Sequence, residues 1–139
     1  MHSYYKDPES TEKTITADGW LKTGDVGILD QNGYLKITDR IKDMFIVGGF
    51  NAYPAEIENI FLNHSSIQQV AIIGVADERM GEVPKAFVVK KKNDHITADE
   101  VISWAKDNMA NYKVPREIIF LDELPTNASG KIMKYKLRT

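Results

Sequence analysis

Short apolar runs separated by glycine-rich or charged turns are the strongest constraint on the fold of this 139-residue chain. Residues 27–29 and 34–37 flank the sequence Asp30-Gln31-Asn32-Gly33, and an Asn-Gly pair between apolar runs is typical of a β-hairpin. Further strands are predicted at residues 44–47, 70–75, 86–89 and 117–121. None of these runs approaches the length of a membrane-spanning helix.

Two segments have the periodicity of amphipathic helices. The first begins near Pro54, because proline is favoured at the first position of a helix. The second begins at Thr97, where Glu100 completes a capping box. The inward positions are Ile57, Ile60 and Phe61 in the first helix and Val101, Trp104 and Ala105 in the second. The order hairpin, β, α, β, β, α, β predicts an α+β fold, a small mixed sheet covered by helices.

The first eighteen residues are polar and show no clear period, so we predict surface chain there. A boundary is expected at Asp39-Arg40, because the charged residues 39–43 are poor core material and suit a surface connection where backbone angles can change. Residues 1–38 should then end one unit, and residues 43–139 should form a compact domain.

Composition excludes several classes of protein. A net charge of −2 and a pI of about 5.9 argue against a dedicated nucleic-acid-binding protein. The chain has no cysteine for disulfides or thiolate metal sites, and its three histidines lack ligand spacing, so no metal site is predicted. Neither a transmembrane stretch nor a signal peptide is recognisable, so a cytoplasmic location is expected by default.

Lys131 follows Gly130 in a turn-rich segment close to the end of the chain. A lysine in this setting is a mobile point charge that can reach a carboxylate or a phosphate. A Walker A loop is the competing interpretation and fails twice, because Pro125 replaces its first glycine and Ile132 replaces its Ser or Thr.

Five polar or glycine-rich motifs occur in a fixed order. They are residues 19–25 (GWLKTGD), 39–43 (DRIKD), 48–58 (GGFNAYPAEIE), 112–115 (YKVP) and 125–131 (PTNASGK). The series resembles the adenylate-forming enzymes, and among them the acyl-CoA synthetases, or AMP-forming acyl-CoA ligases. The resemblance covers nearly the whole chain but only about the last quarter of such an enzyme.

The resemblance implies two nucleotide-binding residues. Asp25 would hold the ribose hydroxyls of ATP or AMP, and a carboxylate can accept two such hydrogen bonds. Arg40 would contact the ribose and the phosphates, a task that suits a planar, permanently charged group. From the residues alone, Asp25 could equally be a turn residue, and Arg40 could form a surface salt bridge with Asp39 or Asp43.

Two lysines match positions that serve catalysis in this family. Lys42 matches the hinge, placed within residues 39–42, about which a small C-terminal domain rotates between two half-reactions. Lys131 matches the catalytic lysine of the first half-reaction, in which a carboxylate attacks the α-phosphorus of ATP and a lysine offsets the repulsion between the two anions. The plain alternative for both is a solvent-exposed lysine.

A glycine-rich loop matches the part of the family that receives CoA. Gly48, Gly49 and Phe50 would line the tunnel for the pantetheine arm, with Gly49 closest to it because a missing side chain permits close approach. The alternative is a turn that needs a positive φ. Glu56 and Glu58 are expected to have a structural role at the positive end of the following helix.

The function implied is activation of a carboxylic acid, expected to be a fatty acid, with ATP and Mg²⁺, followed by acyl transfer to CoA. Residues 1–38 would be the tail of a large N-terminal adenylation domain, which is then the missing partner, and the chain alone should be inactive. Position 134 is Lys where many relatives carry Arg. A carrier-protein adenylation module, a luciferase-like enzyme and a non-catalytic binding domain remain alternatives.

Overall fold

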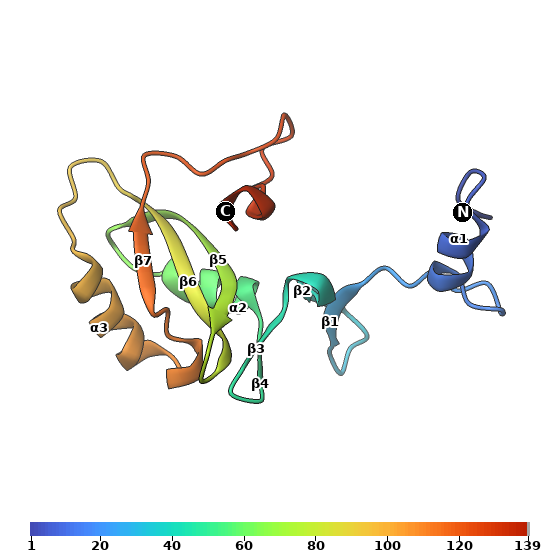
Figure 1. Cartoon of the computed structure of the whole chain (residues 1–139), viewed down its shortest axis with the longest axis horizontal. Helices are drawn as coiled ribbons and strands as arrows, with labels where there is room; N and C mark the ends of the chain where they lie inside the picture. The colour runs from blue at the N-terminus through green and yellow to red at the C-terminus, as the bar shows by residue number, and fades with distance from the viewer. Residues whose placement is uncertain (139) are drawn as a thin grey trace.

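A computed structural model describes residues 1–138, so Thr139, the last residue of the expected compact domain, lies outside the described part (Figure 1). The helices and strands are α1 (Pro8–Thr14), β1 (Asp25–Leu29), β2 (Leu35–Arg40), β3 (Phe45–Val47), β4 (Phe50–Ala52), α2 (Pro54–Phe61), β5 (Ile67–Asp77), β6 (Gly81–Lys90), α3 (Ala98–Asn108) and β7 (Glu117–Phe120). Three 3₁₀ turns are η1 (Ile41–Asp43), η2 (Asn111–Lys113) and η3 (Lys134–Leu137). The expected α+β fold is confirmed.

The main sheet has five strands and is mixed, as predicted. Its order is β4-β3-β6-β5, and β7 pairs with β6 as well. The β6–β7 pair is parallel, whereas β3–β4, β3–β6 and β5–β6 are antiparallel. Strands β5 and β6 extend well beyond the apolar runs that predicted them, so only residues 78–80 connect the two strands.

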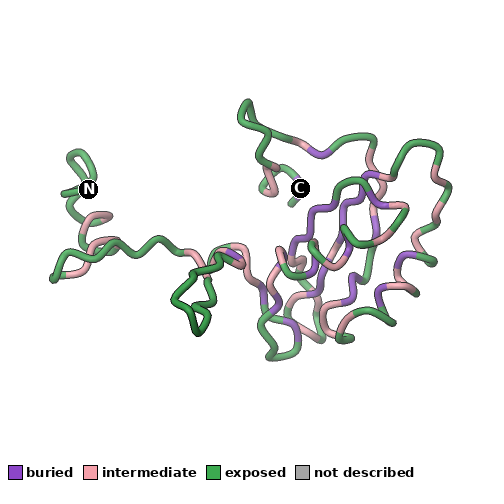
Figure 2. Tube along the Cα trace, turned by 180° about the vertical axis from the view of Figure 1, so that it is seen from behind, coloured by how far each residue is buried: buried purple, intermediate pink, exposed green. Residues whose placement is uncertain are grey.

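Both faces of the sheet are covered by other parts of the chain. Successive side chains of a strand point to opposite faces, so each central strand contributes to two cores. On one face Ile72 and Val88 belong to a core that includes residues of both α2 and α3. On the other face Ile73 and Val89 pack with Leu124 and Leu137 from the end of the chain. Figure 2 shows that the buried positions are concentrated in and around this sheet. The C-terminal segment is therefore part of the domain rather than a loose tail.

The first two strands form the expected hairpin as a separate two-stranded sheet. In Figure 1 this hairpin and α1 extend away from the five-stranded sheet. Several large apolar side chains of the hairpin are exposed: Ile28, Leu29, Tyr34, Leu35 and Ile37.

The structure contains two elements beyond those predicted. Residues 8–14 lie at the surface, as expected, but form the helix α1, with Pro8 in the first turn and the Asp7 carboxylate accepting a hydrogen bond from Ser10 N–H at 2.9 Å. Periodicity could not reveal this helix because it buries no residue. Strand β4, directly after Gly48 and Gly49, is the second unpredicted element. Among residues 1–138, no helix is long and apolar enough to cross a membrane.

Candidate functional site

The two expected nucleotide-binding residues lie opposite each other on the hairpin. Asp25 and Arg40 are register partners of β1 and β2, and Arg40 Nε donates to Asp25 Oδ1 at 2.9 Å. The salt-bridge alternative for Arg40 is thus realised with Asp25, and not with Asp39 or Asp43. Both side chains keep solvent access, at 40% for Arg40 and 28% for Asp25. The pair is therefore oriented and still accessible to a ligand.

Three cations from two of the motifs, 39–43 and 125–131, line one hollow. Arg40, Lys42 and Lys131 line a space of about 310 Å³, together with Asp43, Asn127, Ile132, Met133, Lys134 and Tyr135. Within residues 1–138 neither Lys42 nor Lys131 lies within salt-bridge distance of a carboxylate. Two exposed and unpaired ammonium groups beside one space can attract an anion.

The loop that carries Lys131 is organised by one side chain that the sequence did not single out. Asn127 Oδ1 accepts hydrogen bonds from Lys131 N–H at 2.8 Å, from Ser129 Oγ at 2.8 Å and from Ser129 N–H at 3.1 Å. Asn127 N–H donates to the Lys131 carbonyl at 2.9 Å, and a bridge between Thr126 and Ile132 closes the loop. Asn side chains commonly bond nearby backbone in this way. The backbone at Lys131 is thus defined while its side chain stays exposed.

The base of this loop is tied to helix α2. Lys134 Nζ lies 2.7 Å from Glu58 Oε1, and the two side chains are only 20% and 17% exposed. Ile72 N–H in β5 donates to the same carboxylate oxygen at 2.8 Å. Burial raises the pKa of Glu58 above its ordinary value, and the nearby Lys134 ammonium opposes that rise. The structural role expected for Glu58 is seen, but through Lys134 and β5 rather than through the start of the helix.

Glu56 is tied to a different motif. Its carboxylate lies 2.5 Å from Lys113 Nζ in η2. The two glutamates of α2 therefore connect the helix to the motif at residues 112–115 and to the turn η3 near the end of the chain.

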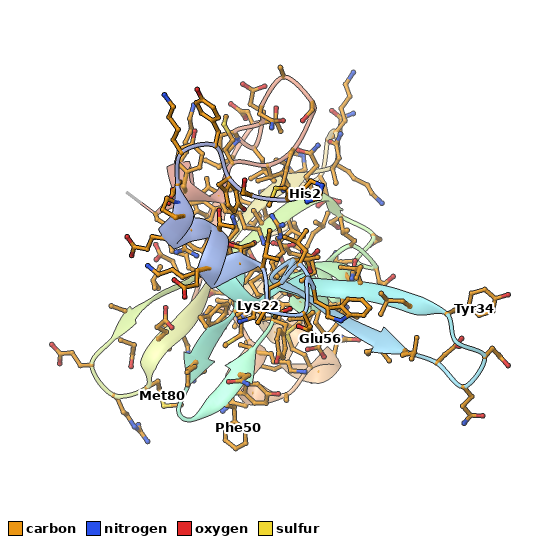
Figure 3. All side chains as sticks on the ribbon, turned by 90° about the vertical axis from the view of Figure 1, so that its right-hand side faces the viewer. His2, Lys22, Tyr34, Phe50, Glu56 and Met80 are labelled. Atoms are coloured by element: carbon orange, nitrogen blue, oxygen red, sulfur yellow. The ribbon has the colours of Figure 1, made fainter. Side chains whose placement is uncertain are left out.

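The glycine loop lies apart from the cationic hollow, at the turn between β3 and β4. Gly48 and Gly49 have φ values of 55° and 89°, so the turn needs the left-handed backbone that glycine allows. Phe50 is 61% exposed and stacks on Tyr112 with ring centroids 5.1 Å apart. Gly48 N–H donates to the Met80 carbonyl at 2.8 Å, and Figure 3 shows Phe50 and Met80 at neighbouring turns. The positive-φ interpretation is correct and leaves a ligand role open.

Asp39 departs from the sequence-based expectation. The expected surface position is wrong for this residue, which is only 7% exposed. Its two carboxylate oxygens accept hydrogen bonds from Arg40 N–H at 2.7 Å and Ala55 N–H at 2.8 Å. A buried carboxylate needs such donors, and Ala55 lies in the first turn of α2. Asp39 thereby connects the hairpin to α2.

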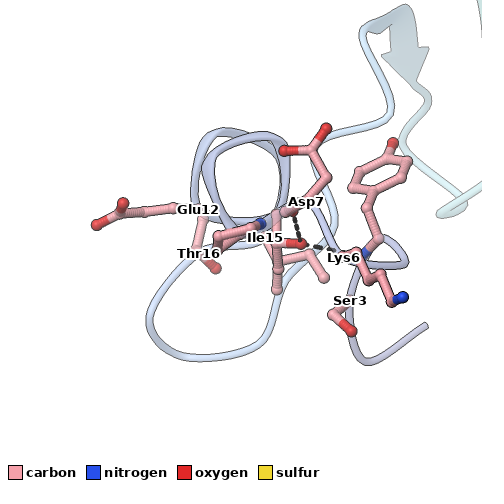
Figure 4. A pocket seen from close by; sticks show the side chains of 9 residues that line it. Ser3, Lys6, Asp7, Glu12, Ile15 and Thr16 are labelled. Atoms are coloured by element: carbon pink, nitrogen blue, oxygen red, sulfur yellow. Dashed lines mark hydrogen bonds between the residues drawn. The ribbon is translucent and has the colours of Figure 1, made fainter.

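Another hollow lies away from the expected site residues. It has a volume of about 620 Å³, lies beside α1 and is lined by Ser3, Lys6, Asp7, Glu12, Ile15 and Thr16, among others (Figure 4). In the described part of the chain, no group of three or more His, Cys, Asp or Glu side chains is arranged to hold a metal ion.

Comparison with known proteins gives the same assignment for most of the compact domain. The family model of the AMP-binding enzyme C-terminal domain matches residues 56–131. A relative from Rhodococcus jostii (strain RHA1), a 3-[(3aS,4S,7aS)-7a-methyl-1,5-dioxo-octahydro-1H-inden-4-yl]propanoyl:CoA ligase, is 56% identical over 138 residues. The match covers 99% of this chain and 27% of that protein, so the chain spans about a quarter of this relative's length.

Solved structures also align with nearly the whole of this chain. ATP-bound MatB from Rhodopseudomonas palustris aligns over 98% of this chain and 27% of its own, with a TM-score of 0.93 and 38% identity. Apo MatB aligns over the same shares with 39% identity but a TM-score of 0.72. The amide bond synthetase McbA from Marinactinospora thermotolerans covers 99% of this chain with 28% of its own, at a TM-score of 0.91 and 34% identity.

The motifs, the fold, the family model and these similarities agree, and the acyl-CoA ligases among the relatives match nearly the whole chain. The chain belongs to the family of AMP-binding enzyme C-terminal domains.

Proposed function

We propose that this chain is the C-terminal part of an AMP-forming acid–thiol ligase. Such an enzyme activates a carboxylic acid with ATP as an acyl-adenylate and then transfers the acyl group to the thiol of CoA. The observation that carries the proposal is the hollow in which Arg40, Lys42 and Lys131 come together, two of them without an acidic partner among residues 1–138.

Lys131 would serve the first half-reaction. A carboxylate oxygen bonds to the α-phosphorus of ATP, and the bond from that phosphorus to pyrophosphate breaks. Both reactants are anions, so a lysine between them stabilises the charge that accumulates in the transition state. Its exposed side chain on an ordered backbone supports this role.

Asp25 and Arg40 would bind the nucleotide. In the described part of the chain, the hydrogen bonds of the Asp25 carboxylate engage Oδ1, through Arg40, and leave Oδ2 for ribose hydroxyls. Arg40 has further N–H donors for phosphate oxygens. The salt bridge between them would fix the carboxylate before the nucleotide arrives.

The region around Lys42 would act as the hinge between residues 1–38 and the compact domain that starts at residue 43. Two structures of one protein, MatB, support this division. They align with this chain at TM-scores of 0.93 and 0.72 although their sequence identities to it are nearly the same. This difference between the two scores supports a division into parts whose relative arrangement can change.

The loop at Gly48, Gly49 and Phe50 would receive the pantetheine arm of CoA. No added Cβ at Gly49 would meet another atom within 4 Å, so the space beside this glycine is open. ATP would be used with Mg²⁺, for which the described residues supply no cluster of ligands.

The acid that is activated would be a fatty acid or a related, ring-containing acid, as in the Rhodococcus jostii relative. An amide-forming enzyme is a second candidate, because McbA resembles this chain over 99% of its length. The two candidates differ in the acceptor of the acyl group, which is a thiol in the first and an amine in the second.

A chimera tests the proposal. This chain would replace the matching 27% of the Rhodococcus jostii ligase, and the product would be assayed with that enzyme's acid, ATP and CoA. We expect acyl-CoA and AMP to form in the chimera and neither to form with the 139-residue chain alone. An inactive but folded chimera, or activity of the chain alone, would contradict the proposal, and amine-dependent product without CoA would favour the second candidate.

A further inference from the structure

Lys131 needs a fixed position, and its own side chain makes no bond that could provide one within residues 1–138. The loop from Thr126 to Ile132 projects from the domain in Figure 1, so its direction depends on how its base is held. Across the base of the loop, Met133 N–H donates to the Pro125 carbonyl at 2.7 Å. At the C-terminal side, the chain enters η3 at Lys134.

The side chain of Lys134 is the polar attachment of η3 to the rest of the domain. It reaches Glu58, whose carboxylate also holds the backbone of β5 through Ile72 N–H. One carboxylate oxygen thus connects the C-terminal segment, helix α2 and the sheet. Leu137, at the other end of η3, is buried against the second core and provides the apolar attachment.

The low exposure of this pair makes the loss of either partner costly. An ion pair in water adds little, because solvent screens it and both side chains move. Here the side chains are about four-fifths covered, so loss of one partner leaves the other charge buried and without compensation. The Lys85–Glu117 pair between β6 and β7 differs, since Glu117 is 53% exposed.

We propose that Glu58 is a positioning residue for adenylation, acting through Lys134 to hold the loop that carries Lys131. This inference depends on the proposed function, in which Lys131 serves only the first half-reaction. Because a displacement of about 1 Å at a reacting group can slow a reaction roughly a hundredfold, a loosened base would weaken Lys131 without removing it. Acyl transfer from a preformed adenylate to CoA would not depend on this pair.

The test separates the two half-reactions in the active chimera. Adenylation is measured as formation of acyl-AMP in a single turnover, and acyl transfer is measured with synthetic acyl-AMP and CoA. We expect Lys134→Met to slow adenylation about 10- to 100-fold and to leave acyl transfer unchanged. Lys134→Arg should keep both rates, because Arg can bond the Glu58 carboxylate, and Lys85→Met is the matched control that should also keep both.

A double variant that replaces both charged side chains controls for misfolding of the single variants. Glu58→Gln combined with Lys134→Met leaves no buried unpaired charge, so this double variant should fold even where a single change does not. Its adenylation should be slow, and its acyl transfer should be normal. Equal slowing of both steps by these variants, or unchanged adenylation, would overturn the positioning role. Unchanged adenylation in Lys131→Met would instead overturn the proposed function, so the two failures are distinguishable.

Discussion

The Asp39 carboxylate at the end of β2 accepts a hydrogen bond from the backbone N–H of Ala55 in the first turn of α2, at 2.8 Å. This bond connects the hairpin to the compact domain in the arrangement that resembles ATP-bound MatB. The same carboxylate accepts from Arg40 N–H, so one buried side chain fixes both the end of the hairpin and the start of the helix.

Substitution of Asp39 should therefore destabilise the chain. Asp39→Ala removes an acceptor from a helix N-terminus and should lower the free energy of unfolding by about 1–2 kcal/mol. Asp39→Asn keeps one carbonyl acceptor and should cost less than the alanine variant. Urea unfolding followed by circular dichroism measures both, and an alanine variant as stable as the original chain would show that the bond contributes nothing.

The stability of the Lys134→Met variant should depend on pH. Burial raises the pKa of Glu58, and Lys134 opposes that rise, so removal of Lys134 should raise this pKa further. A carboxyl group whose pKa is raised on folding stabilises the folded state fully below its unfolded pKa, and this contribution is lost as pH rises through the folded pKa. The ordinary pKa of a glutamate such as Glu58 is about 4.5. The backbone N–H of Ile72 also opposes the rise, and Asp39 adds to it.

We therefore expect Lys134→Met to cost about 3 kcal/mol at neutral pH, and clearly less near pH 4. Urea unfolding at a series of pH values measures this difference. Lys85→Met, at a more exposed pair, should cost under about 1 kcal/mol and change little with pH. A cost for Lys134→Met that is the same at pH 4 and pH 7 would mean that Glu58 is not the group that Lys134 compensates.

Asn127 should control the mobility of the Lys131 loop. Asn127→Ala removes the acceptor for Lys131 N–H and for both donors of Ser129. Backbone order parameters of residues 128–131 should fall from values near 0.85, typical of ordered backbone, to below about 0.6. Asn127→Asp retains an oxygen at the same place and should keep the loop ordered. Nitrogen-15 relaxation measures both variants, and an ordered loop in Asn127→Ala would assign its shape to the backbone bridge alone.

Gly49 should separate the two half-reactions in the opposite sense from Lys131. Gly49→Ala places a methyl group at a backbone with φ 89°, which should cost about 1–2 kcal/mol of strain, and it fills the open space proposed for the pantetheine arm. Acyl transfer from synthetic acyl-AMP to CoA should slow in the chimera, while adenylation should keep its rate. If adenylation alone were slowed, the placement of CoA at this loop would be wrong.

Local signals predicted much of the fold. Thr97 and Glu100 form the complete capping box at the start of α3, and Pro54 is the first residue of α2. The hairpin around Gly33 follows from its Asn-Gly turn, and most residues assigned to the core are indeed covered. These features depend on residues close together in the sequence, which is why they could be read from it.

Long-range contacts could not be predicted in the same way. Asp39 is a charged residue of a type usually found at the surface, and only its hydrogen bond with Ala55 N–H makes it part of the interior. Glu58 and Lys134 are both charged residues in polar segments, and no periodicity pairs them. Asn127 was visible only as one member of a motif, whereas its role depends on how a turn brings three donors to one oxygen. The ligand roles of Asp25, Arg40 and the glycine loop stay predictions. The hinge role of Lys42 and the catalytic role of Lys131 stay predictions as well.

The most direct measurement is ATP–pyrophosphate exchange, dependent on the carboxylic acid, in the chimera with and without Lys131→Met. The exchange reports adenylation alone, because it needs no CoA. We expect the substitution to reduce the exchange rate by about 100-fold or more, as for removal of one group that stabilises transition-state charge, while acyl transfer from synthetic acyl-AMP continues. Exchange at the rate of the unsubstituted chimera would contradict the role of Lys131.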